Sequence, residues 1–317
     1  MPSVGIVGGR GYVAEELLRQ LADHPSIEVA CVASGSLEGQ RVQDQFPQLP
    51  YPDLRFVAPR PASLAPQPVD LWVLALSNGE APPLVAELEK ESGRSLKFID
   101  IGADFRCDPA WQYGLTEIFS EQIQRASRVA NPGCYATGIQ LALWPVRQWL
   151  RGAAVAFGVS GYSGAGRTPS PRNDPQRLAD NLLPYQMVGH QHEREVTQHL
   201  GHPVRLLPHV APFFRGISLT IRFGLTDPWS LEGLQAEYAA LYRAATCVQF
   251  VEEPPEIAEV RDTPHCRIGG LVRDSEGENH WVVVSALDNL AKGAATQAIQ
   301  NANLMLGRTH DEGLRRG

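Results

Sequence analysis

The fold of the first half of this chain is decided by residues 4–14, which read VGIVGGRGYVA. The first four are apolar or small, which favours a buried strand, and Gly8, Gly9 and Gly11 follow directly. From Ala14 onward apolar residues recur at helical spacing as far as Leu21. The pattern predicts a strand, a glycine turn and a helix.

The glycines of this turn have the spacing Gly8-x-x-Gly11-x-x-Ala14. Such a turn lets the backbone approach a pyrophosphate at the N-terminus of a helix. The alternative is a tight strand-to-helix turn without a ligand. Because the glycines stand between a predicted strand and a predicted helix, we favour dinucleotide binding. The expected cofactor-binding residues here are Gly8, Arg10, Gly11, Tyr12 and Val13.

Farther along, predicted strands alternate with helices. Strands are expected at 27–33, 71–76 and 96–101, and a helix near 83–91. This alternation implies a parallel sheet that helices cover on both faces, which is a Rossmann-like doubly wound α/β fold. The pattern breaks at Asn131-Pro132-Gly133, and an apolar helix is expected over 135–150.

The second half is expected to form an α+β domain with a mostly antiparallel sheet. Its predicted strands are 153–159, 216–223, 248–251 and 281–287, with a helix near 231–244. A polar, proline-containing stretch at 168–184 predicts a long ordered loop or lid. The alanine-rich helix expected at 293–306 should pack on the first domain. The predicted domains are 1–133, completed by a C-terminal helix at 289–317, and 134–288.

Composition excludes several classes of protein. The 317 residues are 43% hydrophobic, which is enough for cores in about two domains. The formal charge of −7, without a block of Lys or Arg, argues against nucleic-acid binding. No apolar run approaches the about 20 residues that span a bilayer, and no secretory signal opens the chain, so we expect a cytoplasmic protein without a membrane segment. The five scattered cysteines argue against a disulfide framework and a structural zinc site.

The end of the second predicted strand indicates the choice of cofactor. An NAD site usually has an acidic residue there to bind the ribose hydroxyls. This strand instead runs Val32-Ala33-Ser34-Gly35-Ser36. Ser34 and Ser36, with Arg10 and Arg41, are suited to a 2′-phosphate, so we predict NADP(H). The alternative is that both arginines are merely solvated.

Cys134 follows Asn131-Pro132-Gly133 and stands where the apolar helix begins. A helix N-terminus favours a thiolate, but its contribution of about 0.3–1 kcal/mol is smaller than the roughly 2 kcal/mol needed to bring a thiol pKa from about 8.5 to about 7. A cationic partner is therefore expected, and His190 and His192 are the candidates. The alternatives are a buried structural cysteine, two surface histidines, or a metal site, for which no third ligand has recognisable spacing. We therefore expect no metal.

With these residues in view, the sequence resembles the N-acetyl-γ-glutamyl-phosphate reductases, relatives of aspartate-semialdehyde dehydrogenase. The resemblance runs nearly end to end. The matching segments are 8–14, Ala103-Asp104-Phe105-Arg106, 130–135, Ser163-Gly164-Ala165-Gly166-Arg167, His190-Gln191-His192, Arg215-Gly216-Ile217 and 288–295.

The resemblance implies an enzyme of arginine biosynthesis that reduces an acyl phosphate with NADPH through a cysteine thioester and releases inorganic phosphate. Cys134 would be the nucleophile and the histidine pair its acid/base partner. The other implied residues are Asn131 for the oxyanion, Arg106 and Arg167 for the substrate phosphate, Arg215 for the α-carboxylate, Glu195 for substrate, and Ser163, Gly164 and Asn289 for cofactor. A homodimer or homotetramer, built on the sheet of the second domain, is also implied.

The sequence departs from the family pattern at several positions. Arg194 replaces a proline after the histidine pair, Ser77-Asn78-Gly79 replaces Pro-His-Gly, Asp262-Thr263-Pro264 replaces Gly-Ser/Thr-Asn, and Gly35 replaces an arginine. Two other functions remain open at this point. One is the reduction of an aspartyl or aminoadipyl phosphate, and the other is a non-catalytic NADP-binding sensor.

Overall fold

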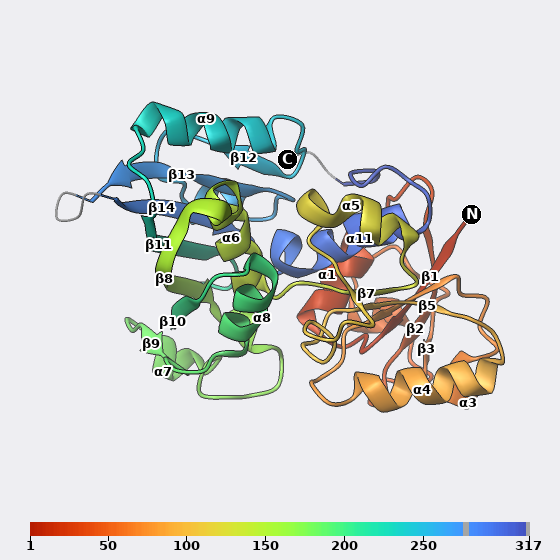
Figure 1. Ribbon diagram of the computed structural model, residues 1–317. Helices are drawn as coiled ribbons and strands as arrows, with labels where there is room; N and C mark the ends of the chain where they lie inside the picture. Colours follow the sequence, from red (N-terminus) through yellow and green to blue (C-terminus); the bar gives the residue numbers. More distant parts are fainter. Residues whose placement is uncertain (275–278, 315–317) are drawn as a thin grey trace. The chain divides into compact units, whose positions relative to one another are not determined.

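The computed structural model describes residues 1–274 and 279–314, which divide into two compact units (Figure 1). The first contains Met1–Pro132 and the C-terminal segment that starts at Ala294, and the second contains Gly133–Gly293. The helix range predicted at 289–317 ends in three residues that lie outside the described part of the chain.

The first unit is built on a seven-stranded parallel sheet with the order β3-β2-β1-β4-β5-β7-β6. Its strands are β1 Ser3–Val7, β2 Glu28–Ala33, β3 Phe56–Val57, β4 Leu71–Leu74, β5 Lys97–Asp100, β6 Gln112–Tyr113 and β7 Arg128–Ala130. The doubly wound fold and its four predicted strands are confirmed. β3, β6 and β7 were not predicted, because segments of two or three residues are too short to show periodicity.

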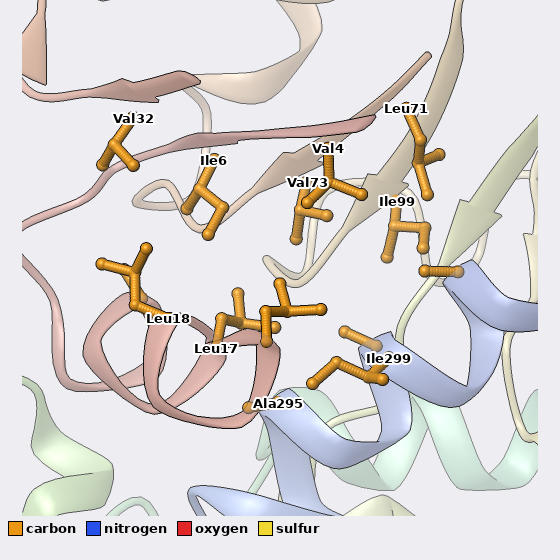
Figure 2. Close-up of a cluster of buried hydrophobic side chains, with 14 of the residues drawn as sticks. Val4, Ile6, Leu17, Leu18, Val32, Leu71, Val73, Ile99, Ala295 and Ile299 are labelled. Carbon is orange, nitrogen blue, oxygen red and sulfur yellow. The ribbon is translucent and has the colours of Figure 1, made fainter. Parts of the chain in front are cut away.

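Helices cover both faces of this sheet because its strands present apolar side chains alternately to each side. Val4 and Ile6 of β1 belong to one buried cluster with Leu17 of helix α1 (Figure 2), whereas Val7 belongs to a second cluster with Leu84 of α4. The helices are α1 Tyr12–Leu21, α2 Val42–Gln45, α3 Pro61–Leu64, α4 Ala81–Ser92, α5 Thr116–Arg125 and α11 Thr296–Met305.

The last helix, α11, packs on the same face of the sheet as α1. Ile299 of α11 lies in the cluster with Leu17, Val73 and Ile99 (Figure 2). A π-helical turn at Ala291–Ala295 precedes the helix, which therefore begins later than the predicted range 293–306.

The second unit contains a seven-stranded mixed sheet with the order β12-β13-β14-β11-β8-β10-β9. The pairs β8/β10 and β12/β13 are parallel and the other neighbours are antiparallel, which confirms the mostly antiparallel prediction. The strands are β8 Leu150–Gly161, β9 Leu183–Pro184, β10 Val204–Ala211, β11 Ile217–Leu225, β12 Val248–Phe250, β13 Cys266–Arg273 and β14 His280–Leu287.

The main helices of this unit lie on one face of its sheet. Helix α6 packs on β11 and β14, and α9 packs on β12 and β13. On the opposite face Val155 and Phe157 of β8 are each 40% exposed and Leu207 of β10 is 36% exposed. The helices are α6 Cys134–Leu143, α7 Pro175–Leu178, α8 Gln191–Leu200, α9 Leu231–Tyr242 and α10 Ile257–Val260.

Helix α6 is shorter than the predicted helix 135–150. It ends at Leu143, and residues Trp144–Trp149 form a 3-10 helix. Pro145 has no N–H to continue the α-helical hydrogen bonds, which explains the change. In the described ranges 1–274 and 279–314, no helix is both long and apolar enough to cross a membrane.

Candidate active site

The glycine turn after β1 is tied to two neighbouring strands. The N–H groups of Gly8 and Gly9 donate to the carbonyl of Ala33 at 3.0 and 2.9 Å. Gly8 has a φ of +92°, and a Cβ there would lie 2.1 Å from the carbonyl oxygen of Ala75. Only glycine fits a position with this backbone conformation and this close approach.

The turn leads directly into α1. Gly11 is the N-cap residue, and in the described structure no side chain caps the helix. A Cβ on Gly11 would have no neighbour nearer than 3.7 Å, so there is open space at the helix start. The N–H groups and the dipole of the first turn therefore suit a pyrophosphate.

The residues expected to choose the cofactor differ in how accessible they are. Arg10 and Ser36 are exposed, whereas Ser34 is buried and its N–H donates to Val57 O at 3.0 Å. The Arg41 guanidinium is paired with Asp44 at 2.7 Å in an exposed ion pair. Arg10 and Ser36 are thus better placed than Arg41 to meet a 2′-phosphate.

The loops that follow β4 and β5 bind each other where the sequence departs from the family pattern. The N–H of Gly79 donates to both carboxylate oxygens of Asp104, at 2.8 and 2.9 Å. Asn78 Oδ1 accepts the N–H of Ala103 at 3.2 Å. Both loops lie at the carboxyl ends of neighbouring parallel strands, which is the edge where doubly wound sheets bind ligands.

Cys134 is the first residue of α6, as expected. The N-cap residue Gly133 donates its N–H to Oε1 of Glu195 at 2.8 Å, and Glu195 is only 1% exposed. Glu195 lies on α8, so a buried carboxylate holds the start of the helix that carries the cysteine. This bond indicates a positioning role for Glu195, which the resemblance placed among substrate ligands.

His190 and His192 are both buried at the start of α8, which excludes the alternative of two surface histidines. His190 is the N-cap, and its Nδ1 accepts the N–H of His192 at 3.2 Å. The ring centroids of His190 and His192 lie 6.2 and 6.0 Å from that of Tyr135, which follows Cys134. These distances do not distinguish the two histidines. Because Nδ1 of His190 accepts a hydrogen bond, the neutral ring carries its hydrogen on Nε2.

Two tyrosines beside the cysteine were not predicted. Burial, with the nearby charge of Cys134, raises the pKa of Tyr185 to about 12, and burial raises the pKa of Tyr135 well above its usual value. Their side chains are hydrogen-bonded to each other, and the Tyr185 ring lies edge-on to His190 at 5.7 Å. Both remain protonated near neutral pH. Tyr185 follows the polar loop at 168–184, and nothing in that pattern indicates such a position.

Asn131, expected to hold an oxyanion, uses each of its polar atoms within the first unit. Its N–H donates to Asp100 O at 2.7 Å, and its carbonyl accepts Nε of Arg106 at 3.0 Å. Its Oδ1 accepts Nδ2 of Asn301 at 3.0 Å, and its own Nδ2 donates to Ala294 O at 3.2 Å. The side chain has no exposed surface. The four bonds indicate an anchoring role in place of the expected substrate contact.

Arg106 is also engaged with the backbone. Besides its bond to Asn131, it donates from Nη2 to the carbonyl of Ile101 at 2.8 Å. The side chain is 8% exposed. Arg106 therefore ties the segment after β5 to the segment after β7.

Arg215, expected to bind a carboxylate of the substrate, already binds two carboxylates of the protein. Its Nε donates to Asp288 at 2.5 Å and its Nη1 to Asp262 at 2.7 Å. Asp262 belongs to the segment that departs from the family pattern, and its own N–H also donates to Asp288 at 2.8 Å. The positive charge of Arg215 is thereby balanced inside the second unit.

The side chain of Asn289 is similarly committed. Its Oδ1 accepts the N–H of Gly216 at 2.7 Å and its Nδ2 donates to Oγ of Ser163 at 2.9 Å. Asn289 thus fixes the start of the segment Ser163–Arg167. Gly164 in this segment is exposed, and Arg167 at its end is half-buried.

The second unit therefore combines a cysteine at a helix start with two buried histidines and two phenols, a set suited to covalent capture of an acyl group. In the part of the chain that the structure describes, no three His, Cys, Asp or Glu side chains are grouped to hold a metal ion.

Comparison with protein families identifies the class. A family model described as "Semialdehyde dehydrogenase, NAD binding domain" matches residues 3–126, and one described as "Semialdehyde dehydrogenase, dimerisation domain" matches residues 134–289. The chain belongs to the semialdehyde dehydrogenase family. Its cofactor is accordingly a nicotinamide dinucleotide, as expected.

Curated relatives narrow the class. Proteins named "N-acetyl-gamma-glutamyl-phosphate reductase" from Xanthomonas campestris pv. campestris (strain 8004) and Xylella fastidiosa (strain M23) are 45% and 44% identical to this chain over 305 residues. Both matches cover 96% of this chain, and they cover 96% and 92% of the relatives. The resemblance inferred from the motifs is confirmed.

Solved structures share the fold at much lower identity. Aspartate semialdehyde dehydrogenase II from Vibrio cholerae has a TM-score of 0.78 at 18% identity, covering 97% of this chain and 98% of that one. The enzyme from Candida albicans, solved with NADP, has a TM-score of 0.74 at 15% identity, covering 96% and 98%.

Proposed function

We propose that this protein reduces N-acetyl-γ-glutamyl phosphate to N-acetylglutamate 5-semialdehyde with NADPH, in the cytoplasm, as a step of arginine biosynthesis. The observation that carries the proposal is the position of Cys134 at the first residue of α6, beside Tyr135 and the buried His190 and His192. The name of its relatives supplies the substrate.

The chemistry begins with the thiolate of Cys134. Its attack forms a C–S bond to the acyl carbon, and the bond from that carbon to the phosphate oxygen breaks with its electron pair on phosphate. A histidine takes the thiol proton and passes it to the departing phosphate. For His190, Nε2 carries the hydrogen because Nδ1 accepts the N–H of His192, so His192 is proposed as the histidine that takes the thiol proton.

When bound at the glycine turn, NADPH would supply the hydride that reduces the thioester. The negative oxygen of the resulting adduct needs hydrogen-bond donors, and the N–H groups in the first turn of α6 are suited to this because they point along the helix axis. When the C–S bond breaks, sulfur recovers its electron pair and the aldehyde forms. The hydroxyl of Tyr135 donates its hydrogen to the carbonyl of His209 at 3.0 Å, so Tyr185 is the phenol proposed to add a donor near the sulfur.

The arrangement of hydrogen bonds changes how the substrate-binding arginines are assigned. Arg106 donates to two backbone carbonyls and Arg215 pairs with two carboxylates, so both are proposed to shape the site. Arg167, half-buried at the end of the segment that Asn289 fixes, keeps its proposed contact with a substrate anion.

For the cofactor, we propose that the pyrophosphate is held by Gly8, Gly11, Tyr12 and Val13. The 2′-phosphate is proposed to be held by the exposed Arg10 and Ser36, together with the buried Ser34. The exposed side chains of Arg10 and Ser36, and the absence of an acid at residues 34–36, support NADPH over NADH. A kcat/KM that favours NADH would contradict this choice. Ser163, Gly164 and Asn289 are proposed to border the nicotinamide through the backbone, since the Asn289 amide is engaged.

The test is the reverse reaction with N-acetylglutamate semialdehyde, NADP+ and inorganic phosphate, run beside aspartate semialdehyde and aminoadipate semialdehyde. We expect phosphate-dependent formation of NADPH with the first substrate only. Cys134→Ala should abolish turnover and leave NADPH binding intact. Turnover by that variant would exclude the covalent route, and preference for another semialdehyde would change the substrate.

We also propose that the protein self-associates through the open face of its second sheet. Phe157 of β8 lies beside Leu207 of β10 and Thr220 of β11, and Phe157 and Leu207 are both exposed. The family description of this region as a dimerisation domain supports the proposal. Light scattering should show that Phe157→Glu yields monomers, whereas Leu241→Glu, at an equally exposed leucine on α9, should leave the oligomer intact.

A further inference from the structure

The proposed substrate carries two anionic groups, a phosphate and an α-carboxylate, and both require cations. Two of the three expected arginines are committed within the protein, since Arg215 pairs with two carboxylates and Arg106 donates to backbone carbonyls. The charge of Arg215 is thus matched within the protein, and a further cation near Cys134 would help to bind the two anions. Arg172, which no motif indicated, has the required position.

Arg172 lies in the loop that precedes α7, and hydrogen bonds within this loop define its course. Asn173 Oδ1 accepts the N–H of Ser170 at 2.7 Å, and Asn173 Nδ2 donates to the carbonyls of Gly166 and Thr168 at 2.8 and 2.9 Å. The backbone beside Arg172 is thereby closed into a compact turn.

The guanidinium of Arg172 lies over the ring of Tyr185, with 5.0 Å from Cζ to the ring centroid, and is hydrogen-bonded to the Tyr185 side chain. Stacking of this kind fixes the plane of the guanidinium. Tyr185 lies edge-on to His190 at 5.7 Å and is hydrogen-bonded to Tyr135, the residue after Cys134. A single side chain thus separates Arg172 from the nucleophile and its partners.

The charge of Arg172 is not balanced by a carboxylate among the residues that the structure describes. The nearest acid in the sequence, Asp174, is the N-cap of α7 and accepts the N–H of Gln176 at 3.0 Å. Arg172 is exposed, so its remaining N–H groups can meet a ligand. A charged planar group with several donors matches a phosphate.

We propose that Arg172 binds the phosphate group of the substrate and holds it as it leaves. The inference rests on the proposed function. Attack by Cys134 breaks the bond between the acyl carbon and the phosphate oxygen, so the phosphate lies next to the reacting carbon, whereas three further carbons separate the α-carboxylate from it. A cation supported by Tyr185, close to Cys134, is therefore placed for the phosphate. As the bond breaks, its electron pair moves onto the phosphate oxygens, and the guanidinium N–H groups stabilise that charge.

The reverse reaction tests this assignment, because inorganic phosphate and the semialdehyde are then separate substrates. For Arg172→Met we expect the KM for phosphate to rise about tenfold or more, as for the loss of a charge-assisted contact, while the KM for the semialdehyde changes less than about twofold. Arg172→Lys should recover part of the loss. Arg177→Met is the matched control. Arg177 is an exposed arginine on α7, the short helix that follows the loop of Arg172, and this variant should behave as wild type.

A second measurement does not depend on turnover. Inorganic phosphate should slow the alkylation of Cys134 by iodoacetamide in the wild-type protein and in Arg177→Met, and this protection should be lost in Arg172→Met. Equal protection in all three proteins would overturn the inference. If Arg172→Met raised the KM for the semialdehyde alone, Arg172 would belong to the carboxylate and the inference would be wrong. If Arg172→Met raised both KM values and also slowed alkylation without phosphate, its role would be purely structural, which would likewise overturn the inference. If wild type shows protection but no reverse reaction, the proposed function fails and the phosphate site stands.

Discussion

The side-chain amide of Asn301 donates a hydrogen bond of 3.0 Å to Oδ1 of Asn131, and neither side chain has any exposed surface. Asn301 lies on α11, and Asn131 lies three residues before Cys134. Asn301 also donates to Gly114 O at 2.9 Å and accepts from Thr116 at 2.9 Å. The C-terminal helix and the segment that leads to the cysteine are therefore joined by buried polar groups.

Replacing Asn301 by alanine should lower the free energy of unfolding by about 2–3 kcal/mol, because the partners of its amide lose their hydrogen bonds in a buried place. Asn181→Ala removes an exposed asparagine and should change it by less than about 0.5 kcal/mol. Urea unfolding of both variants provides the comparison. Equal stability of the two would show that the buried network contributes little.

The carboxyl of Asp100 predicts an unusual response to pH. Asp100 is completely buried, and burial raises its pKa from 3.8 to about 6. Between these two pKa values the folded state binds a proton that the unfolded chain does not. The stability contributed by the protonated Asp100 carboxyl is fully present below pH 3.8 and is lost as the pH rises through about 6. At about 1.4 kcal/mol per pKa unit, the neutral variant Asp100→Asn should be more stable than wild type by up to about 3 kcal/mol at pH 8. Urea unfolding should show this difference disappearing near pH 4, and a constant difference would contradict the assignment.

Burial of His24 predicts the opposite dependence of stability on pH from that of Asp100. Its Nδ1 accepts the N–H groups of Ser26 and Ile27 at 3.3 and 3.1 Å, and its Nε2 donates to Glu312 O at 2.9 Å. Burial lowers the pKa of His24, so the unfolded chain binds a proton more readily than the folded chain does. The stability contributed by the neutral His24 ring is therefore present above about pH 6.5 and is lost as the pH falls below that value.

The variant His24→Asn keeps an acceptor for the two N–H groups but does not titrate. Between pH 8 and pH 5.5 it should lose less unfolding free energy than wild type. Since Asp100 titrates in both proteins, the difference between them reports His24. Parallel pH profiles would exclude this role.

Gly293 lies against Cys134, the proposed nucleophile. A Cβ built on Gly293 would be 2.8 Å from Cβ of Cys134 and 3.2 Å from the carbonyl of Asp288, so an alanine would push one of them away. Because small displacements of a nucleophile are costly, Gly293→Ala should reduce kcat by about tenfold or more, and overpacking should lower stability by about 1–3 kcal/mol. Iodoacetamide alkylation of Cys134 should slow as well.

The matched variant is Gly35→Ala, where a Cβ would have 3.8 Å to its nearest neighbours. It should leave the alkylation rate of Cys134 unchanged. A folded Gly293→Ala protein with normal kcat would show that the contact does not set the position of the sulfur.

Local sequence patterns predicted two kinds of element: those whose apolar residues repeat regularly, and those that need a particular residue such as glycine. The glycine turn, the four long strands of the first sheet and the start of α6 are of these kinds. Strands β10 and β13 were missed because Pro208 interrupts one and Gly269-Gly270 interrupts the other. β13 accommodates its glycines with a shift of register between Gly269 and Val272, and a Cβ on Gly269 would lie 2.4 Å from Glu253 O. Only pairing with neighbouring strands makes this segment a strand.

The candidate site divides in the same way. Cys134 and the two histidines could be proposed from residue type and spacing, because few residues can act as nucleophile or exchange protons. The roles of Arg106, Arg215, Asn131 and Asn289 could not, since each side chain can bind either a ligand or the protein itself. Tyr185 and Arg172 were missed because a tyrosine and an arginine in a polar loop are common.

The amino-acid sequence by itself determined the architecture and the class of cofactor, and it led to the proposal of Cys134 as the reactive sulfur, since these depend on periodicity and on residues with special backbone or chemical properties. Only the tertiary structure decided which polar groups are used up within the protein and which can still bind a ligand. Hydrogen bonds and ion pairs saturate, so what an arginine or asparagine can do depends on the partners that distant segments bring to it.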